Sequence, residues 1–196
     1  MKQIKTYLLI FFFLILNNHI KADDIRDFEI DEMSIGDSLL KYFSKTKITN
    51  ALKNVIYYPG SKKMKIILLL PEINSSYEAY DFHILDNDPN YKIQSVKGRL
   101  KISLNECLKK KKVVVNELEK IFYGVKKNEY ENYYNYTYGN SKAYLTDFNL
   151  NDGSVRVWCA NWDKNDKTVI KNNWYDTLNV SISSKNYLYF IDNEAY

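Results

Sequence analysis

The sequence predicts an α+β domain in which a mostly antiparallel sheet packs against one long helix and two or three short helices. The sheet is indicated by two pairs of β-rich segments, each pair separated by a short loop of Asp, Asn, Gly, Pro or Ser residues. The long helix is indicated by residues 104–123, whose apolar side chains recur at helical spacing.

Two short helices and a strand are expected in the first part of the chain. Ser34 and Asp37 have capping-box-like spacing, which predicts a helix with apolar positions between residues 35 and 43. Ser44 predicts the start of a second short helix that ends near residue 55. Residues 63–70 then form an apolar strand that Pro71 closes.

The middle of the chain predicts a hairpin and the long helix. Residues 77–85 and 91–103 flank a loop at residues 86–90, and a phase slip at Ser95–Val96 indicates a bulge. Ser103 and Glu106 open the long helix, and Gly124 is well placed to follow its end. The Tyr-rich residues 126–140 that follow are expected to be a polar connection.

The last part of the chain predicts a second hairpin, one strand and a terminal helix. Residues 142–150 and 155–162 flank Asn151-Asp152-Gly153-Ser154, a strong turn sequence. A strand is expected at residues 175–183 and a short helix at residues 185–194. We expect residues 23–196 to form a single domain, because the chain contains neither an internal repeat nor a flexible linker.

The first 22 residues have the pattern of a secretory signal peptide. Lys2 and Lys5 precede an apolar run at residues 7–16, and a short polar stretch ends at Ala22. Cleavage after Ala22 would give a periplasmic or secreted protein without an integral membrane span. The alternative is an uncleaved anchor, since Ile20 occupies a position where a small residue is usual.

Removing this segment changes the charge balance. The whole chain has 28 basic and 24 acidic residues, a net charge of +4. Loss of Lys2, Lys5 and Lys21 leaves a net charge of +1. We therefore expect no nucleic-acid partner, because such binding needs an excess of basic residues.

The two cysteines predict a disulfide. Cys107 lies on the apolar side of the long helix, and Cys159 shares a strand face with Val155 and Val157. Both side chains are expected to enter the same helix–sheet core in an oxidising compartment, where a bond closing 52 positions contributes about 4 kcal/mol. The alternative is two buried free thiols.

One strand face carries the candidate ligand-binding residues. Arg156, Trp158 and Trp162 lie opposite Cys159, and Asn179 lies on the polar face of the last strand with Thr177 and Ser181. If these strands are neighbours, flat rings lie beside amide and hydroxyl groups, an arrangement that suits sugar or peptide recognition. The alternative is that the Tyr-rich connection or a terminal helix covers the tryptophans.

Catalytic and metal sites have weaker support. Asp81 and His83 share a strand face, so a small secreted hydrolase using carboxylates near this pair is the alternative function. Asp86, Asp88 and Asn90 begin like a calcium loop, but Tyr91 and Lys97 replace its required Gly and Glu. We assign no catalytic residue and expect neither a metal nor another cofactor.

Three parts of the sequence carry a resemblance: residues 24–44, Glu106-Cys107-Leu108 and Val157-Trp158-Cys159. They resemble an uncharacterised family of small exported proteins from AT-rich marine bacteria, over nearly the whole mature chain. This resemblance implies export and the fold; the family has no assigned activity, so it implies no site residues. Residues 33–38 are also distantly similar to SmpA-like envelope lipoproteins, whose lipid-bearing cysteine this chain lacks. The leading expectation is a non-enzymatic binding or envelope-accessory module whose partner is a glycan, a peptide or an envelope protein.

Overall fold

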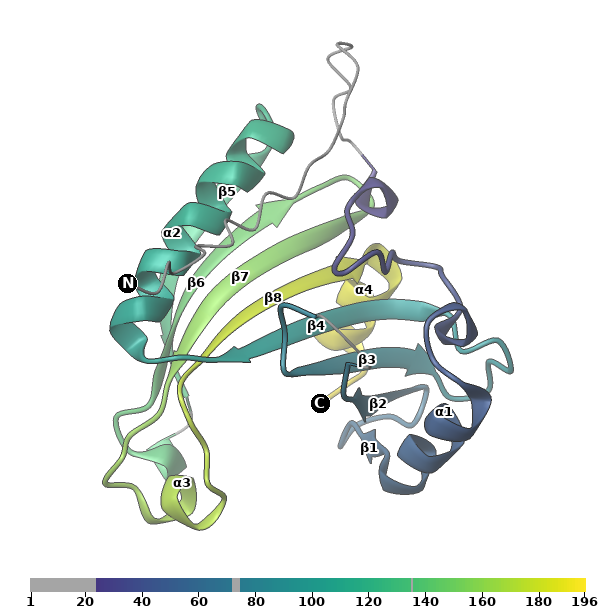
Figure 1. Cartoon of the computed structure of the whole chain (residues 1–196), viewed down its shortest axis with the longest axis horizontal. Helices are drawn as coiled ribbons and strands as arrows, with labels where there is room; N and C mark the ends of the chain where they lie inside the picture. The colour runs from purple at the N-terminus through teal and green to yellow at the C-terminus, as the bar shows by residue number, and fades with distance from the viewer. Residues whose placement is uncertain (1–23, 72–74, 135) are drawn as a thin grey trace, which may run out of the picture.

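The computed structural model describes residues 24–71, 75–134 and 136–196, so the predicted signal peptide lies outside the described residues. The described chain forms an antiparallel sheet of eight strands in the order β1-β2-β3-β4-β8-β7-β6-β5 (Figure 1). The strands are β1 Ile56–Tyr57, β2 Met64–Leu69, β3 Ala79–Leu85, β4 Ile93–Lys101, β5 Lys126–Tyr133, β6 Lys142–Asn149, β7 Gly153–Asn161 and β8 Thr177–Ser184. The predicted α+β class is confirmed.

Helices lie on both faces of this sheet. The α-helices are α1 Lys45–Ala51, α2 Leu104–Ile121, α3 Lys167–Lys171 and α4 Lys185–Asn193, and the 3-10 helices are η1 Ile25–Asp27, η2 Leu39–Lys41, η3 Leu52–Asn54 and η4 Tyr136–Tyr138. Helix α2 packs over β7 and β8, whereas α4 passes behind β4 and β8 in Figure 1 and contacts the opposite face. The hydroxyls of Ser44, Ser103 and Ser184 cap α1, α2 and α4 by accepting backbone N–H bonds.

The main core lies on the face that α2 covers. Alternate residues of β7 and β8 point into it and are buried: Val155, Val157, Cys159, Leu178, Val180 and Ile182. Helix α2 covers this half of the sheet with Cys107, Val115 and Leu118, while the N-terminal segment contributes Ile25, Ile30, Met33 and Leu39 to the same core. Cys107 and Cys159 are joined as a disulfide with their Cα atoms 5.9 Å apart, as the sequence predicted.

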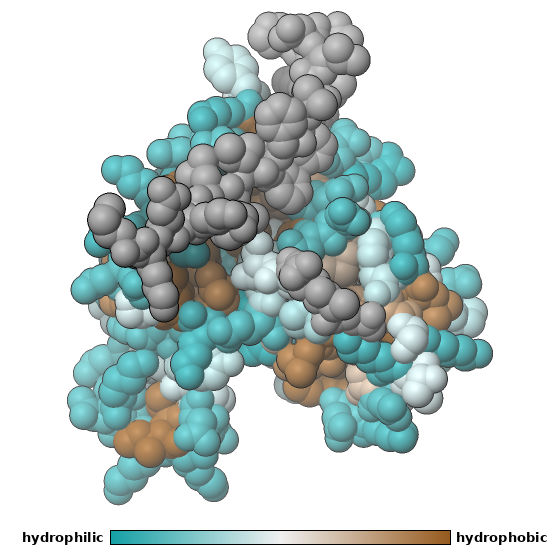
Figure 2. Space-filling view, viewed as in Figure 1, coloured by the Kyte–Doolittle hydropathy of each residue, from teal (hydrophilic) through white to brown (hydrophobic). Residues whose placement is uncertain are grey.

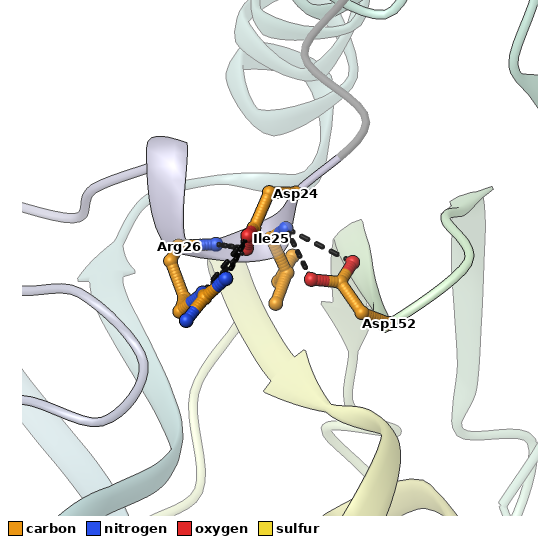
Figure 3. Close-up of polar contacts among 4 residues, drawn as sticks. All are labelled: Asp24, Ile25, Arg26 and Asp152. Carbon is orange, nitrogen blue, oxygen red and sulfur yellow. Dashed lines mark hydrogen bonds and ion pairs between the residues drawn. The ribbon is translucent and has the colours of Figure 1, made fainter.

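The N-terminal segment is anchored to the loop between β6 and β7 (Figure 3). The backbone N–H of Ile25 donates to both carboxylate oxygens of Asp152, at 3.0 and 3.1 Å. The Asp24 carboxylate pairs with the Arg26 guanidinium, and this side-chain hydrogen bond lowers the pKa of Asp24. These contacts place Ile25 against Gly153. A Cβ atom added to Gly153 would lie only 3.0 Å from Ile25 Cγ1.

The prediction of a helix between residues 34 and 43 is wrong. The Asp37 carboxylate does accept the Ser34 N–H at 3.2 Å, which is half of the expected capping box. However, Gly36 has a φ of +89°, and its N–H donates to the Ile93 carbonyl at 2.9 Å. The segment therefore forms backbone hydrogen bonds to Tyr91 and Ile93 in place of a continuous helix, and only η2 is helical.

Two other expectations need adjustment. Residues 126–133, expected to be a connection, form the edge strand β5, which pairs with β6. The predicted bulge lies slightly earlier than Ser95–Val96: His83 pairs with Ser95 and Ile84 with Ile93, which leaves Gln94 as the extra residue.

The surface in Figure 2 shows the face that carries the N-terminal segment and α2. Hydrophilic side chains predominate there, and a hydrophobic patch lies on the lobe that contains α3, where Ile170 is 57% exposed. Within the described ranges, no helix combines the length and the apolar character that crossing a membrane requires.

Candidate ligand-binding cleft

Short polar side chains on β8 form the floor of a trough on the face opposite α2. Thr177, Asn179 and Ser181 all point to this face and are buried. In the sheet register, Asn179 lies between Trp158 of β7 and Arg99 of β4. Ser181 lies in the same way between Arg156 and Lys97, and Thr177 lies between Ala160 and Lys101.

The short side chains of β8 are therefore flanked by longer side chains from β7 on one side and β4 on the other. Neighbouring strands are about 4.8 Å apart, so the backbones of β7 and β4 are about 10 Å apart. The trough runs along β8, with α4 packed on the sheet at one end and the lobe of α3 at the other (Figure 1). A cleft of about 540 Å³ occupies it. The lining residues are Lys97, Arg99, Asn132, Tyr134, Ala143, Leu145, Arg156, Trp158, Ala160, Trp162, Asn172, Asn173, Trp174, Tyr175, Thr177 and Asn179.

Trp158 lines this cleft beside Asn179, its register partner on β8. Its side chain is partly exposed, and Lys97 Nζ lies 5.9 Å from the centre of its ring. Its indole N–H hydrogen-bonds the Tyr134 hydroxyl, whose pKa burial raises. Because Trp158 sits on a central strand with both neighbours paired, its ring is held by a rigid support.

Trp162 has a different environment, at the end of the cleft. Its ring stacks on Tyr134, with centroids 4.5 Å apart and planes within 11°. Trp174 packs on it as well, again at 4.5 Å, and Tyr138 contacts both indoles. The expected covering by tyrosines thus applies to Trp162, which builds a wall of the cleft, and much less to Trp158.

Arg156 is fixed by a carboxylate from the neighbouring strand. Its Nε and Nη2 donate to the two oxygens of Asp147, at 2.7 and 2.8 Å. The Tyr130 hydroxyl joins this network by donating to Asp147 at 2.9 Å and accepting from Arg156 at 3.1 Å. The hydrogen bond to Asp147 raises the pKa of Arg156, and the carboxylate offsets the positive charge of the guanidinium.

Asn179 contributes to the floor through a contact within its own strand. Its amide N–H donates to Thr177 Oγ1 at 2.8 Å, and the residue is only 2% exposed. The structure thus brings all four predicted binding residues, Arg156, Trp158, Trp162 and Asn179, to one cleft. Both indoles are partly exposed, but the Trp162 ring packs against Tyr134, Tyr138 and Trp174.

The Asp81 and His83 pair is not arranged for acid–base catalysis. His83 Nδ1 lies 2.5 Å from the Tyr58 hydroxyl, and burial lowers the pKa of His83 to about 3. Asp81 is held by Lys97 and by Arg99 Nη2, the latter at 3.1 Å. A general base works best with a pKa near the working pH, and His83 is not among the residues that line the cleft.

The calcium-like sequence at residues 86–90 is a turn. Asp88 accepts the backbone N–H groups of Asn90 and Lys92, at 2.9 and 2.8 Å. Asp163 accepts the backbone N–H groups of Asn140 and Asn165 in another turn. Across the parts of the chain that the structure describes, no group of three or more His, Cys, Asp or Glu side chains is placed to hold a metal ion.

Comparisons with family models, with curated proteins and with solved structures gave no match. The resemblance to small exported proteins of marine bacteria therefore stays a prediction, and the cleft has to be interpreted from its own chemistry.

Sequence reasoning missed the β4 wall of the cleft. Lys97, Arg99 and Lys101 alternate with the inward-facing Val96, Gly98 and Leu100, so their shared face was readable from the sequence. What the pattern does not contain is the pairing of β4 with β8, two segments more than 70 residues apart. Trp174 was missed because it follows a short helix, α3, that the sequence analysis did not predict.

Proposed function

We propose that this chain is an exported, non-enzymatic binding protein that holds an oligosaccharide in the trough along β8. The observation that carries the proposal is Trp158: a partly exposed indole, on a rigid central strand, beside amide and guanidinium groups. Sugar rings present an apolar face and a polar edge, so a flat ring beside short polar groups complements both.

The position of the trough favours a sugar over an extended peptide. Extended peptides commonly bind by adding a strand to an exposed sheet edge, where backbone groups are unpaired. The trough lies over β4, β8 and β7, and each of these strands is paired on both sides. These three strands therefore offer a ligand their side chains alone, and the cleft lining combines aromatic, amide and cationic groups with Thr177 and the apolar Ala143, Leu145 and Ala160.

Export is supported by two independent features. Residues 1–22 have the tripartite pattern of a signal peptide. Cys107 and Cys159 form a disulfide, and structural disulfides are typical of oxidising compartments outside the cytosol.

The test is a binding screen with soluble oligosaccharides, followed by titration calorimetry on any that bind. Trp158→Ala is expected to weaken binding at least tenfold, about 1.4 kcal/mol, because it removes the stacking surface. Tyr189→Ala is the matched aromatic control, since Tyr189 is 60% exposed on α4 and does not line the cleft. Equal affinities of the wild type and Trp158→Ala would refute the assigned site.

A further inference from the structure

The charges along the trough are not balanced. The described residues that line the cleft include Lys97, Arg99 and Arg156 but no Asp or Glu. Asp147 neutralises Arg156 through two hydrogen bonds. Among the described residues, Asp81 is the one carboxylate that pairs with Lys97 and Arg99, so this side of the trough keeps one unmatched positive charge.

Lys101 adds a second positive charge on the same face of β4, next to the cleft: it pairs in the sheet with Thr177, which lines the cleft. Its Nζ lies 4.5 Å from the centre of the Tyr175 ring, and no carboxylate in the described part of the chain pairs with it. Lys97, Arg99 and Lys101 are alternate residues of one strand, so successive members are about 6.8 Å apart along the trough. A row of cations at a regular spacing suits a polymer that repeats its negative charge.

Arg99 also has an unused donor. Its Nη2 contacts Asp81, but its Nε is buried and has no hydrogen-bond partner among the described residues. A buried N–H without a partner is costly, and guanidinium groups prefer to bind oxyanions with two parallel N–H bonds. A small rotation of this side chain toward an oxyanion in the trough would satisfy both preferences.

The aromatic and cationic groups are placed to act on one ligand. Trp158 and Arg99 are both register partners of Asn179, so they face each other across the floor of the trough. A sugar ring that stacks on Trp158 would direct its edge substituents toward Arg99 and Lys97. We infer that the ligand is an acidic oligosaccharide whose carboxylate or sulfate groups bind the β4 wall. This inference rests on the proposed function and adds the charge of the ligand to it.

Single-stranded nucleic acid combines flat rings with repeated negative charge as well. The sequence favours the sugar, because removal of Lys2, Lys5 and Lys21 with the predicted signal leaves the chain nearly neutral. Binding of an oligonucleotide or of an acidic peptide is therefore a competing outcome of the test.

The experiment compares ligands that differ only in charge. Titration calorimetry at low salt would use tetragalacturonate against its methyl ester, and sulfated against unsulfated dextran oligomers. The acidic member of at least one pair is expected to bind about tenfold or more tightly than its neutral partner, an advantage that salt reduces. An oligothymidylate and an oligoglutamate peptide complete the set.

Three charge variants locate the effect. Arg99→Gln and Lys101→Gln should each weaken the acidic ligand about tenfold and leave the neutral one nearly unchanged. Lys101→Gln keeps the test valid if Arg99→Gln misfolds, because no described carboxylate depends on Lys101. Lys109→Gln, an exposed lysine of α2 on the opposite face, is the matched control and should have no effect.

The outcomes separate the two proposals. Equal binding of acidic and neutral members would overturn the inference about charge and leave the proposed function standing. Acidic binding that neither trough variant weakens would also overturn it. Tighter binding of the oligothymidylate or the oligoglutamate would reject a sugar ligand, and failure of every sugar in the screen to bind would overturn both proposals.

Discussion

Burial determines the chemistry of His83. The residue is 8% exposed, and its Nδ1 contacts the Tyr58 hydroxyl, which in turn lies 3.1 Å from the Tyr187 hydroxyl. Burial is the largest cause of its lowered pKa; nearby Lys97 adds to the effect and Asp81 opposes it. Burial also raises the pKa of Tyr187 to about 12, so this cluster is uncharged at neutral pH.

A neutral buried histidine makes the stability of the protein depend on pH. The pKa of His83 is about 3 in the folded chain, against an ordinary value of 6.5. Below pH 6.5 the unfolded chain therefore binds a proton that the folded chain does not, and stability falls as the pH falls. Each pH unit between these two values removes up to about 1.4 kcal/mol of unfolding free energy.

Urea unfolding at pH 7.0, 5.5 and 4.5 would measure this loss in the wild type and in His83→Gln. The variant keeps an acceptor for the Tyr58 hydroxyl but cannot be protonated in this range, so its stability should change less over the same interval. The two proteins would show parallel pH profiles if His83 were protonated in the folded state.

At the scale of elements, a strained turn shapes the N-terminal segment. Ile30 and Met33 exchange two backbone hydrogen bonds of 3.1 Å around Asp31 and Glu32, whose φ angles are 47° and 66°. Two positive φ values in a two-residue turn define a type I′ geometry, for which Asn-Gly is the preferred sequence. The Asp31 carboxylate accepts hydrogen bonds from Ser75 and Tyr80, whereas the Glu32 side chain is exposed.

Glu32→Gly is therefore expected to stabilise the protein by about 0.5–1 kcal/mol, because it removes the strain of a left-handed non-glycine residue. Glu117→Gly, an exposed position inside α2, is the matched control and should lower stability by about 1 kcal/mol. Urea denaturation of both variants measures the two shifts, and a loss of stability in Glu32→Gly would contradict the strain argument.

Local sequence signals decide which helices and strands could be predicted from the sequence. The helices capped by Ser44, Ser103 and Ser184 have local start signals and were found. The edge strand β5 lacks such signals, since almost all of its residues are exposed. It is held instead by pairing with β6 and by cross-strand contacts such as the ion pair of Lys142 with Glu131 at 2.7 Å. A helix was wrongly expected before residue 43 because Gly36 and the bond to Ile93 act against a locally plausible pattern.

At the scale of the whole molecule, the candidate site is assembled by distant pairings. The β7 and β8 side of the trough was predictable, because alternation places Trp158 opposite Cys159 and Asn179 on the polar face of its strand. The β4 side was not, since its position follows from the sheet order alone. Side-chain periodicity tells which face a residue occupies but does not tell which strand lies next to it.

The disulfide fastens α2 to the face of β7 that lies opposite the trough. Cys159 follows Trp158 in β7 and points to the opposite face, where its bond to Cys107 ties the strand to α2. In the chain-entropy model, closing 52 positions stabilises the fold by about 4 kcal/mol. The Cys107→Ala/Cys159→Ala double variant should therefore unfold at lower urea concentration, with a loss of about 2–4 kcal/mol.

A reducing agent provides the internal control for this prediction. It should lower the stability of the wild type toward that of the double variant and leave the double variant unchanged. Thiol titration of the unfolded, non-reduced protein should find no free thiol. Two free thiols, together with equal stability of the wild type and the variant, would show that packing alone holds α2 on the sheet behind Trp158.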